Sequence, residues 1–269
     1  MADHTDRYTH GHHESVLRSH KWRTAENSAA FLLPYLRDGM SLLDVGCGPG
    51  TITADLARRI TGGSVVGVDL PPDVIGAAQT EFGDDRLRFE VGDVYALDFD
   101  DDSFDLVFAH QVLQHLGDPV GALREMLRVL RPGGHVAVRD SDYGAFLWSP
   151  ADPRLTRWLE LYHQLTRRNG AEADAGRNIH RWVRAAGFEE LHVSSSNWTF
   201  QNDEDRAWWG GLWADRVRQS EFATQSVEYG LTTESELDGI ADAFHQWAAD
   251  PEALFIVVHG EVVATKRQG

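Results

Sequence analysis

The chain has little of three things, and each shortage excludes a class of protein. Cys47 is the only cysteine among 269 residues, so no disulfide can form within the chain. No run approaches the roughly 18 unbroken apolar residues that a membrane-spanning helix needs. Basic residues number 25 against 42 acidic ones, and the resulting net charge of −17 would repel a phosphate backbone. We therefore expect no membrane partner and no nucleic-acid partner.

The first residues, MADHTDRYTHGHHES, also lack the apolar core of a secretory signal, so we expect a cytoplasmic protein. His4, His10, His12 and His13 in this segment could suggest a metal site. Tetrahedral sites, however, draw their ligands from spaced, rigid elements, and no CxxC or HExxH motif accompanies these histidines. We therefore expect no metal.

Tryptophan, in contrast, is abundant, with nine residues, most of them in the second half of the chain. These late tryptophans predict aromatic walls in that half. They are Trp148, Trp158, Trp182, Trp198, Trp208, Trp209, Trp213 and Trp247.

Short apolar runs alternate with helical patterns in the first half, which is typical of parallel strands joined by crossover helices. Asp118 and Pro119 have the residue types of an N-cap and a first helical position, and Gly83 is expected to end a helix in the left-handed conformation. The predicted strands are 41–45, 64–70, 86–91, 104–109 and 135–139, and the predicted helices are 51–60, 72–82 and 118–130, after one or two helices in 15–37.

Beyond residue 140 the alternation changes. We expect helices at 153–168 and 177–186, a strand at 191–200, helices at 203–227 and 233–249, and a final β segment at 254–266. No internal repeat or low-complexity linker interrupts the chain, so one domain is expected over residues 1–269. Its parts are cap helices in 1–37, a central core in 40–140, lid helices with a strand in 141–253, and the last β segment in 254–269.

The run LLDVGCGPG joins an apolar strand to an acidic residue and to three glycines, Gly46, Gly48 and Gly50. Glycines allow positive φ and let a ligand lie against the backbone, although a simple tight turn also needs them. A nicotinamide-binding loop would carry glycine or alanine at position 51, where Thr51 stands. A nicotinamide cofactor is therefore disfavoured.

Two further acids follow the next two predicted strands. Asp69 comes about 25 residues after Asp44, where a doubly wound fold presents a carboxylate to a ribose diol. Asp93 follows the third strand and could accept a hydrogen bond from an adenine amino group. Both could simply be solvated acids, but the carboxyl edge of a parallel sheet is where ligands bind.

Taken in order, the segments LLDVGCGPG, VGVDL, GDV and FDLVFAHQVLQHLGDPVGALREMLRVLRPGGHVAV resemble the successive motifs of class I S-adenosylmethionine-dependent methyltransferases. The resemblance covers about residues 40–140, and the nearest group is the quinone-biosynthesis C-methyltransferases and their small-molecule relatives. It implies a doubly wound α/β fold with a seven-stranded, mainly parallel sheet, an N-terminal helical segment and a helical lid insertion. S-adenosylmethionine would be the cofactor and S-adenosylhomocysteine the product.

The resemblance also implies roles for individual residues. Asp44 and the glycine loop would lie near the methionine part of the cofactor, Asp69 at its ribose, and Asp93 at its adenine, while Ala109, His110 and Gln111 would face the sulfonium and the acceptor. Cys47 is expected to be a small buried loop residue without chemistry of its own. The full predicted set of cofactor contacts is Asp44, Gly46, Cys47, Gly48, Asp69, Leu70, Gly92, Asp93, Val94, Ala109 and His110.

Three residues are candidates for acid–base catalysis. His110 and His115 could accept a proton as neutral imidazoles, although His115 could serve only to shape a turn. Tyr8 belongs, with His12 and His13, to a segment that in this family often folds over the cofactor. Helical residues Trp208, Trp209 and Trp213 fit core packing and pocket lining equally well.

The expected function is methyl transfer to a small aromatic or indolic natural-product acceptor, with carbon favoured over nitrogen or oxygen. The late tryptophans favour it, as does the resemblance of YTHGHHESVLRSHKWRTAENSAAFLLPYL to N-termini of actinobacterial natural-product methyltransferases, some of which methylate carbon 3 of indoles. The alternatives are a catalytically silent methyltransferase-like partner subunit, against which the intact glycine loop speaks, and a nicotinamide-dependent oxidoreductase. The chain could also form a homodimer.

Overall fold

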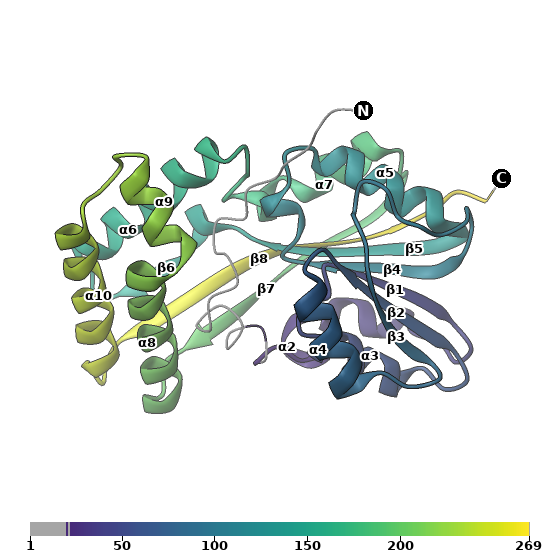
Figure 1. Ribbon diagram of the computed structural model, residues 1–269, viewed down its shortest axis with the longest axis horizontal. Coiled ribbons are helices and arrows are strands. Elements are labelled where there is room, and N and C mark those ends of the chain that lie inside the picture. Colours follow the sequence, from purple (N-terminus) through teal and green to yellow (C-terminus); the bar gives the residue numbers. More distant parts are fainter. Residues whose placement is uncertain (1–19, 21, 269) are drawn as a thin grey trace.

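The computed structural model describes His20 and residues 22–268, and a mixed β-sheet runs through the middle of them (Figure 1). The strand order is β3-β2-β1-β4-β5-β8-β6, and β7 also pairs with β8. Strands β1 to β5 are parallel, whereas β8 runs antiparallel to β5, β6 and β7. The strands are β1 Ser41–Val45, β2 Ser64–Asp69, β3 Leu87–Val91, β4 Phe104–His110, β5 Leu130–Ser141, β6 Leu147–Ser149, β7 Glu190–Phe200 and β8 Leu254–Thr265.

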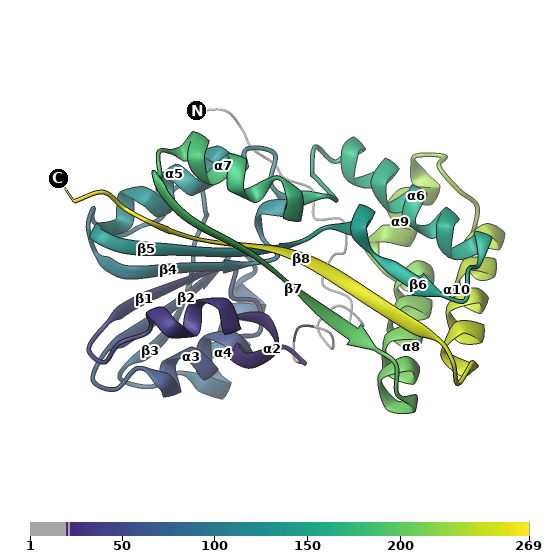
Figure 2. The same ribbon diagram turned by 180° about the vertical axis from the view of Figure 1, so that it is seen from behind.

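Helices cover both faces of the parallel part of the sheet, with α3 and α4 on one face and α5 and α7 on the other (Figures 1 and 2). A second group, α6, α8, α9 and α10, lies where β7 ends and β8 begins (Figures 1 and 2). The helices are α2 Ala25–Ser28, α3 Thr51–Arg59, α4 Pro72–Phe82, α5 Pro119–Val129, α6 Pro153–Arg168, α7 Ile179–Ala186, α8 Asp203–Gln219, α9 Glu221–Glu228 and α10 Glu234–Ala249, with 3₁₀ turns η1 Ala30–Tyr35, η2 Leu113–His115, η3 Tyr143–Ala145 and η4 Ala175–Arg177.

The doubly wound α/β prediction is confirmed, and so are several local signals. Helices α4 and α6 have the predicted boundaries. Asp118 caps α5, since its carboxylate accepts a hydrogen bond from the Gly121 N–H at 2.8 Å, and Pro119 takes the first helical position. Gly187 ends α7 with a φ of 111°.

Other local predictions were wrong. Gly83 is not left-handed, because its φ is −63°. It is needed for space instead, since a Cβ there would lie 2.5 Å from the carbonyl oxygen of Gln79. The long helix expected at 203–227 is split at Ser220, whose hydroxyl caps α9 by accepting a hydrogen bond from the Phe222 N–H.

The N-terminal segment and strands β5 and β6 differ in detail from expectation. Within 15–37, where one or two helices were expected, residues 22–37 hold the short α2 and the 3₁₀ turn η1, which contains Pro34. Pro34 removes a backbone donor, so a regular α-helix is disfavoured there. Strand β5 starts earlier than predicted, at Leu130. The three-residue strand β6 was not predicted and brings the sheet to eight strands rather than seven among the described residues.

The two groups of helices pack around different kinds of core. We call β1 to β5 with α3, α4, α5 and α7 the α/β lobe, whose core is dominated by aliphatic side chains. We call α6, α8, α9 and α10 the helical lobe, whose core is rich in tryptophan, tyrosine and phenylalanine. Strand β8 contributes to both, with Phe255 and Val257 in the helical lobe and Val262 in the α/β lobe. None of the described helices is long and apolar enough to cross a membrane.

Candidate active site

A cavity of about 380 Å³ lies between the two lobes, which is within the size range of small-molecule sites. Its wall has two parts. The glycine-loop half contains Asp44, Gly46, Cys47, Gly48, Asp69, Leu70, Gly92, Asp93 and Val94. The aromatic half contains Trp22, Arg23, His110, Gln111, Gln114, His115, Ser141, Tyr143, Trp198, Trp208, Trp209, Trp213 and Arg216.

The glycine loop between β1 and α3 has the backbone that its sequence predicts. Gly46, Gly48 and Gly50 have φ values of 73°, 53° and 82°, all in the left-handed region that favours glycine. A Cβ on Gly46 would lie 2.3 Å from Cγ2 of Val112, and one on Gly50 would lie 2.6 Å from the Phe89 ring. Bare backbone is therefore required here, and it leaves a cradle at the edge of the cavity.

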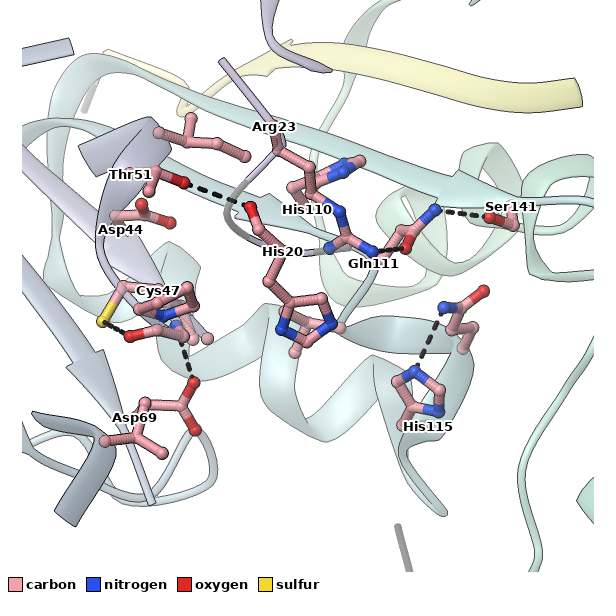
Figure 3. A pocket seen from close by; sticks show the side chains of 18 of the residues that line it. His20, Arg23, Asp44, Cys47, Thr51, Asp69, His110, Gln111, His115 and Ser141 are labelled. Atoms are coloured by element: carbon pink, nitrogen blue, oxygen red, sulfur yellow. Dashed lines mark hydrogen bonds between the residues drawn. The ribbon is translucent and has the colours of Figure 1, made fainter. Parts of the chain in front are cut away.

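Asp69 ends β2 directly beside this loop. One carboxylate oxygen accepts a hydrogen bond from the Gly48 N–H at 2.8 Å (Figure 3), and the other accepts from the Leu70 N–H at 2.7 Å. Asp93 follows β3, and its carboxylate accepts a hydrogen bond from the Tyr95 N–H at 2.9 Å. Both acids line the cavity at the carboxyl ends of neighbouring parallel strands, as predicted.

Asp44 is the deepest of the three carboxyl groups in this half. Burial raises the pKa of Asp44 to about 7. The Thr53 hydroxyl, which donates a hydrogen bond at 2.6 Å, partly lowers it, and the nearby charge of Asp69 raises it further. A cation placed beside Asp44 would therefore be met by a group that is ready to ionise near neutral pH. Burial also raises the pKa of the Cys47 thiol, which stays protonated, as expected of a small packing residue.

Gln111 connects four segments on the opposite side of the cavity. Its φ of 55° is unusual for a residue other than glycine. Its side-chain amide nitrogen donates to the Ser141 hydroxyl at 2.6 Å and lies 3.0 Å from Nε2 of His259, and its oxygen accepts from Arg23 at 2.6 Å (Figure 3). A strained residue in such a network is typical of a functional site.

His110, at the end of β4, presents an unsatisfied atom to the cavity. Its ring is only 5% exposed, and Nε2 has no hydrogen-bond partner among the described residues. Burial lowers its pKa well below the usual value, and the charges of Arg23 and Arg139 lower it further. His110 is therefore neutral, and Nε2 needs a ligand to complete its hydrogen bonding.

His115, in η2, is also neutral. Burial, followed by the charges of Arg23 and Arg216, lowers its pKa to about 3. Its Nε2 lies 3.1 Å from the side-chain nitrogen of Gln114. Both predicted histidines thus line the cavity, but a pKa far below neutrality makes each a better hydrogen-bond acceptor than proton-removing base.

Five tryptophans wall the aromatic half. The Trp22 ring lies 5.2 Å from that of Trp198 and 5.1 Å from that of Trp208, and the Trp198 N–H donates to the Asn27 carbonyl at 2.6 Å. Trp209 and Trp213 are 5% and 1% exposed in the helical core, yet both also line the cavity. The two interpretations that the sequence left open for these residues are therefore both correct.

One described residue of the predicted site, Ala109, does not line the cavity. Ala109 is fully buried in the α/β core, because neighbours along a strand point to opposite faces and His110 takes the cavity side. Tyr8, with His12 and His13, lies outside the described residues. All other predicted contacts line the cavity, and no group of three or more potential metal ligands occurs within His20 and residues 22–268.

Several lining residues were missed from the sequence. Arg23, Tyr143 and Arg216 come from segments outside the motif region, on elements whose orientation depends on tertiary packing. A weak signal was available for Arg216, because it follows Trp213 by one helical turn and so shares its face. Nothing local marks the others.

The strand order, the glycine loop after β1 and the acids after β2 and β3 define a class I methyltransferase. In agreement, a family model described as a methyltransferase domain matches residues 43–138. The chain is 31% identical to an uncharacterized methyltransferase of Schizosaccharomyces pombe over 100% of both chains. It is also 31% identical to a demethylmenaquinone methyltransferase of Clavibacter sepedonicus, over 66% of this chain and 75% of the relative.

Among solved structures, phosphoethanolamine N-methyltransferase 2 of Haemonchus contortus, in complex with phosphomonomethylethanolamine and S-adenosylhomocysteine, has a similar fold. The TM-score is 0.60 at 19% identity, and the match covers 96% of this chain and 59% of that one. The chain belongs to the methyltransferase family, and it is an S-adenosylmethionine-dependent enzyme of class I.

Proposed function

We propose that this methyltransferase acts on a small aromatic or indolic natural product and transfers the methyl group preferentially to carbon. The observation that carries the proposal is the aromatic half of the cavity, where five tryptophans line the wall together with His110, whose Nε2 has no hydrogen-bond partner among the described residues. Flat aromatic walls bind flat aromatic ligands with large apolar contact and favourable ring geometry. The relative named for demethylmenaquinone adds support for an acceptor with a ring system.

The glycine-loop half fits the cofactor. Bare backbone at Gly46 and Gly48 allows the methionine part to lie against the loop, with Asp44 beside its ammonium group. In this proposal Asp69 accepts hydrogen bonds from the ribose hydroxyls, and Asp93 accepts one from the adenine amino group. Leu70, Gly92 and Val94 line the remaining wall. When bound, the cofactor supplies an electrophilic methyl group on its sulfonium.

The residues of the chain then mainly orient the acceptor and exclude water, which is most of what an in-line displacement requires. Neutral His110 accepts a hydrogen bond from a ring N–H or O–H, and this raises the electron density of the ring without removing the proton beforehand. As the ring carbon bonds to the methyl group and the sulfur keeps the electron pair of the broken bond, the methylated ring becomes acidic and loses that N–H or O–H proton through His110 to solvent. Weak basicity at His110 and His115 favours an electron-rich ring carbon over an amine or alcohol that must first be deprotonated.

The test is a transfer assay with cofactor labelled in its methyl group and a panel of indoles, phenols and hydroquinones, with aliphatic amines for comparison. We expect label on an aromatic product, at a ring carbon by NMR. His110→Phe should lower kcat about tenfold or more while S-adenosylhomocysteine binds within about twofold of wild type. Label appearing only in protein, RNA or aliphatic amines would overturn the proposal, and absence of turnover with any acceptor would favour the silent-subunit alternative.

A further inference from the structure

The two halves of the cavity carry opposite charges. Its lining carboxyl groups, Asp44, Asp69 and Asp93, all belong to the glycine-loop half. The aromatic half contains two guanidinium groups, those of Arg23 and Arg216, and the described part of its lining includes no carboxylate. A chain with a net charge of −17 therefore places positive charge at the position of the acceptor.

Arg216 lies in the last turn of α8 and is 5% exposed. Its guanidinium carbon lies 5.1 Å from the ring centroid of Trp213, so the cation is held within the aromatic wall. Taking a charge out of water costs several kcal/mol. A carboxylate that reaches this buried guanidinium would form a charge-assisted hydrogen bond in surroundings of low polarity, where such bonds are strong.

Arg216 and Arg23 affect the same two cavity residues, His115 and Tyr143, although they come from α8 and from the N-terminal segment. The charges of both lower the pKa of His115, after burial. Both also oppose the burial that raises the pKa of Tyr143. Arg23 is held at this place by its hydrogen bond to Gln111 and lies over the Trp198 ring, 5.5 Å from its centroid.

Three acidic groups lie behind this wall, and each is protonated or paired with an arginine outside the cavity lining. Asp140 is fully buried beneath Gln114, whose N–H it accepts at 3.1 Å, and burial raises its pKa to about 8, so it is mostly protonated at neutral pH. Asp142 forms an ion pair with Arg177, whose Nε lies 2.8 Å from the carboxylate. Glu261 pairs in the same way with buried Arg139.

On the basis of the proposed function, we propose that the acceptor is an aromatic acid whose carboxylate is bound by Arg216. The planar guanidinium offers two parallel N–H donors that match a carboxylate, and such charge-assisted pairs are stronger than neutral hydrogen bonds. Arg23 adds a second positive charge nearby, while the aromatic ring packs on the tryptophan wall. The carboxylates of the glycine-loop half repel the same ligand, so acceptor and cofactor sort to opposite sides.

The experiment compares matched ligands on the protein saturated with S-adenosylhomocysteine. Indole-3-acetate and indole-3-acetamide, and likewise 1-naphthoate and 1-naphthamide, differ in charge but hardly in shape. We expect calorimetry to show each carboxylate binding wild type about tenfold or more tightly than its amide. Arg216→Gln should remove this preference, and Arg216→Lys should retain part of it.

Arg218→Gln is the matched control. Arg218 lies on the same helix but faces outward, where it pairs with Asp238 and Asp242 on α10. We expect this variant to keep the full carboxylate preference. Unchanged affinity for S-adenosylhomocysteine in every variant shows that the fold is intact.

Equal binding of acid and amide by wild type would overturn the inference, as would a preference that survives Arg216→Gln, or failure of every acid to bind. These outcomes differ from the outcomes that would contradict the proposed function. Methyl transfer to neutral aromatics that Arg216→Gln leaves unchanged defeats the acid specificity alone. A carboxylate preference without methylation of any aromatic ring defeats the proposed function and leaves the anion site in place.

Discussion

The two halves of the cavity are built in different ways. The glycine-loop half uses backbone conformation and strand-end carboxylates from one stretch of chain between Asp44 and Val94. The aromatic half collects side chains from Trp22 to Arg216, contributed by the N-terminal segment, β4, η2, β5, η3, β7 and α8. A ligand bound by local backbone can be predicted from a short motif, whereas a ligand bound by distant side chains can be inferred only from the fold.

The lobes around these halves differ in a parallel way. Aliphatic residues in the α/β lobe fill the space between sheet and helices, while stacked and edge-on aromatic rings fill the helical lobe. Trp158, for example, contacts Trp213, Phe244 and Phe255. Stability of the helical lobe should therefore depend on a few large side chains, and cofactor binding should not.

The largest effect is expected from Trp158→Ala, because this fully buried ring does not line the cavity. We expect the free energy of unfolding to fall by about 3–5 kcal/mol in urea denaturation. Trp158→Phe should cost much less, since the ring remains and the indole N–H has no hydrogen-bond partner among the described residues. Equal losses in the two variants would break the proposed link between ring packing and stability.

Asp69→Ala tests the glycine-loop half of the cavity. We expect binding of S-adenosylmethionine to weaken by about 1–3 kcal/mol in calorimetry, because hydrogen bonds to the ribose and to the Gly48 N–H are lost. Asp73→Ala, at an exposed position in the first turn of α4, should leave binding unchanged. If wild type releases no heat with the cofactor, or if Asp73→Ala has the same effect, Asp69 does not have this role.

Gly46→Ala should act through backbone and space alone. Left-handed φ costs a residue with a side chain about 1–2 kcal/mol, and the new Cβ would press on Val112, so we expect about tenfold weaker binding of S-adenosylhomocysteine. Gly76→Ala in α4 adds a Cβ that meets nothing within 4 Å, and it should stabilise the fold by roughly 0.5–1 kcal/mol without changing affinity. Normal binding by Gly46→Ala would show that the cradle does not require bare backbone.

The smallest effect concerns pH. Burial raises the pKa of Asp44 to about 7, and a cofactor cation beside the carboxylate would lower it again, so binding should release a proton below that pH. Affinity for S-adenosylmethionine should therefore rise by at most about tenfold from about pH 6 to about pH 8. Asp44→Asn should flatten this profile.

The same group affects the free protein in the opposite direction. The folded state holds a proton that the unfolded chain has already given up, so stability should fall as the pH rises from about 4 to about 7. Urea unfolding of wild type and Asp44→Asn across this range measures the contribution. A wild-type binding profile that Asp44→Asn reproduces would assign the pH dependence to another group.

The sequence predicted the elements whose signals are local. Helices α4 and α6 follow from local helical patterns, and the left-handed glycine loop follows from three glycines after an apolar strand. Strand β6 could not be predicted, because its three residues pair only with the distant end of β8. The conformation of Gly83 was wrong because crowding by Gln79, rather than φ, requires a glycine there.

The residues of the site, too, could be predicted only where a local signal marks them. Asp69 and Asp93 were predicted because their distance from the preceding strand fixes their place at the sheet edge. Arg216 and Trp198 face the cavity only because α8 and β7 pack in one particular orientation against the core. No short-range pattern encodes that orientation.

Strands β7 and β8 form a continuous ribbon that reaches from one lobe to the other (Figure 2). All 11 residues of β7 pair in register with β8, from Glu190 opposite Thr265 to Phe200 opposite Phe255. A slip of one residue would displace the ribbon by about 3.3 Å and turn every side chain to the other face. The fixed register of this ladder therefore sets the distance between the tryptophan wall and the glycine loop. That distance in turn limits the length of the molecule that can bind end to end with the cofactor.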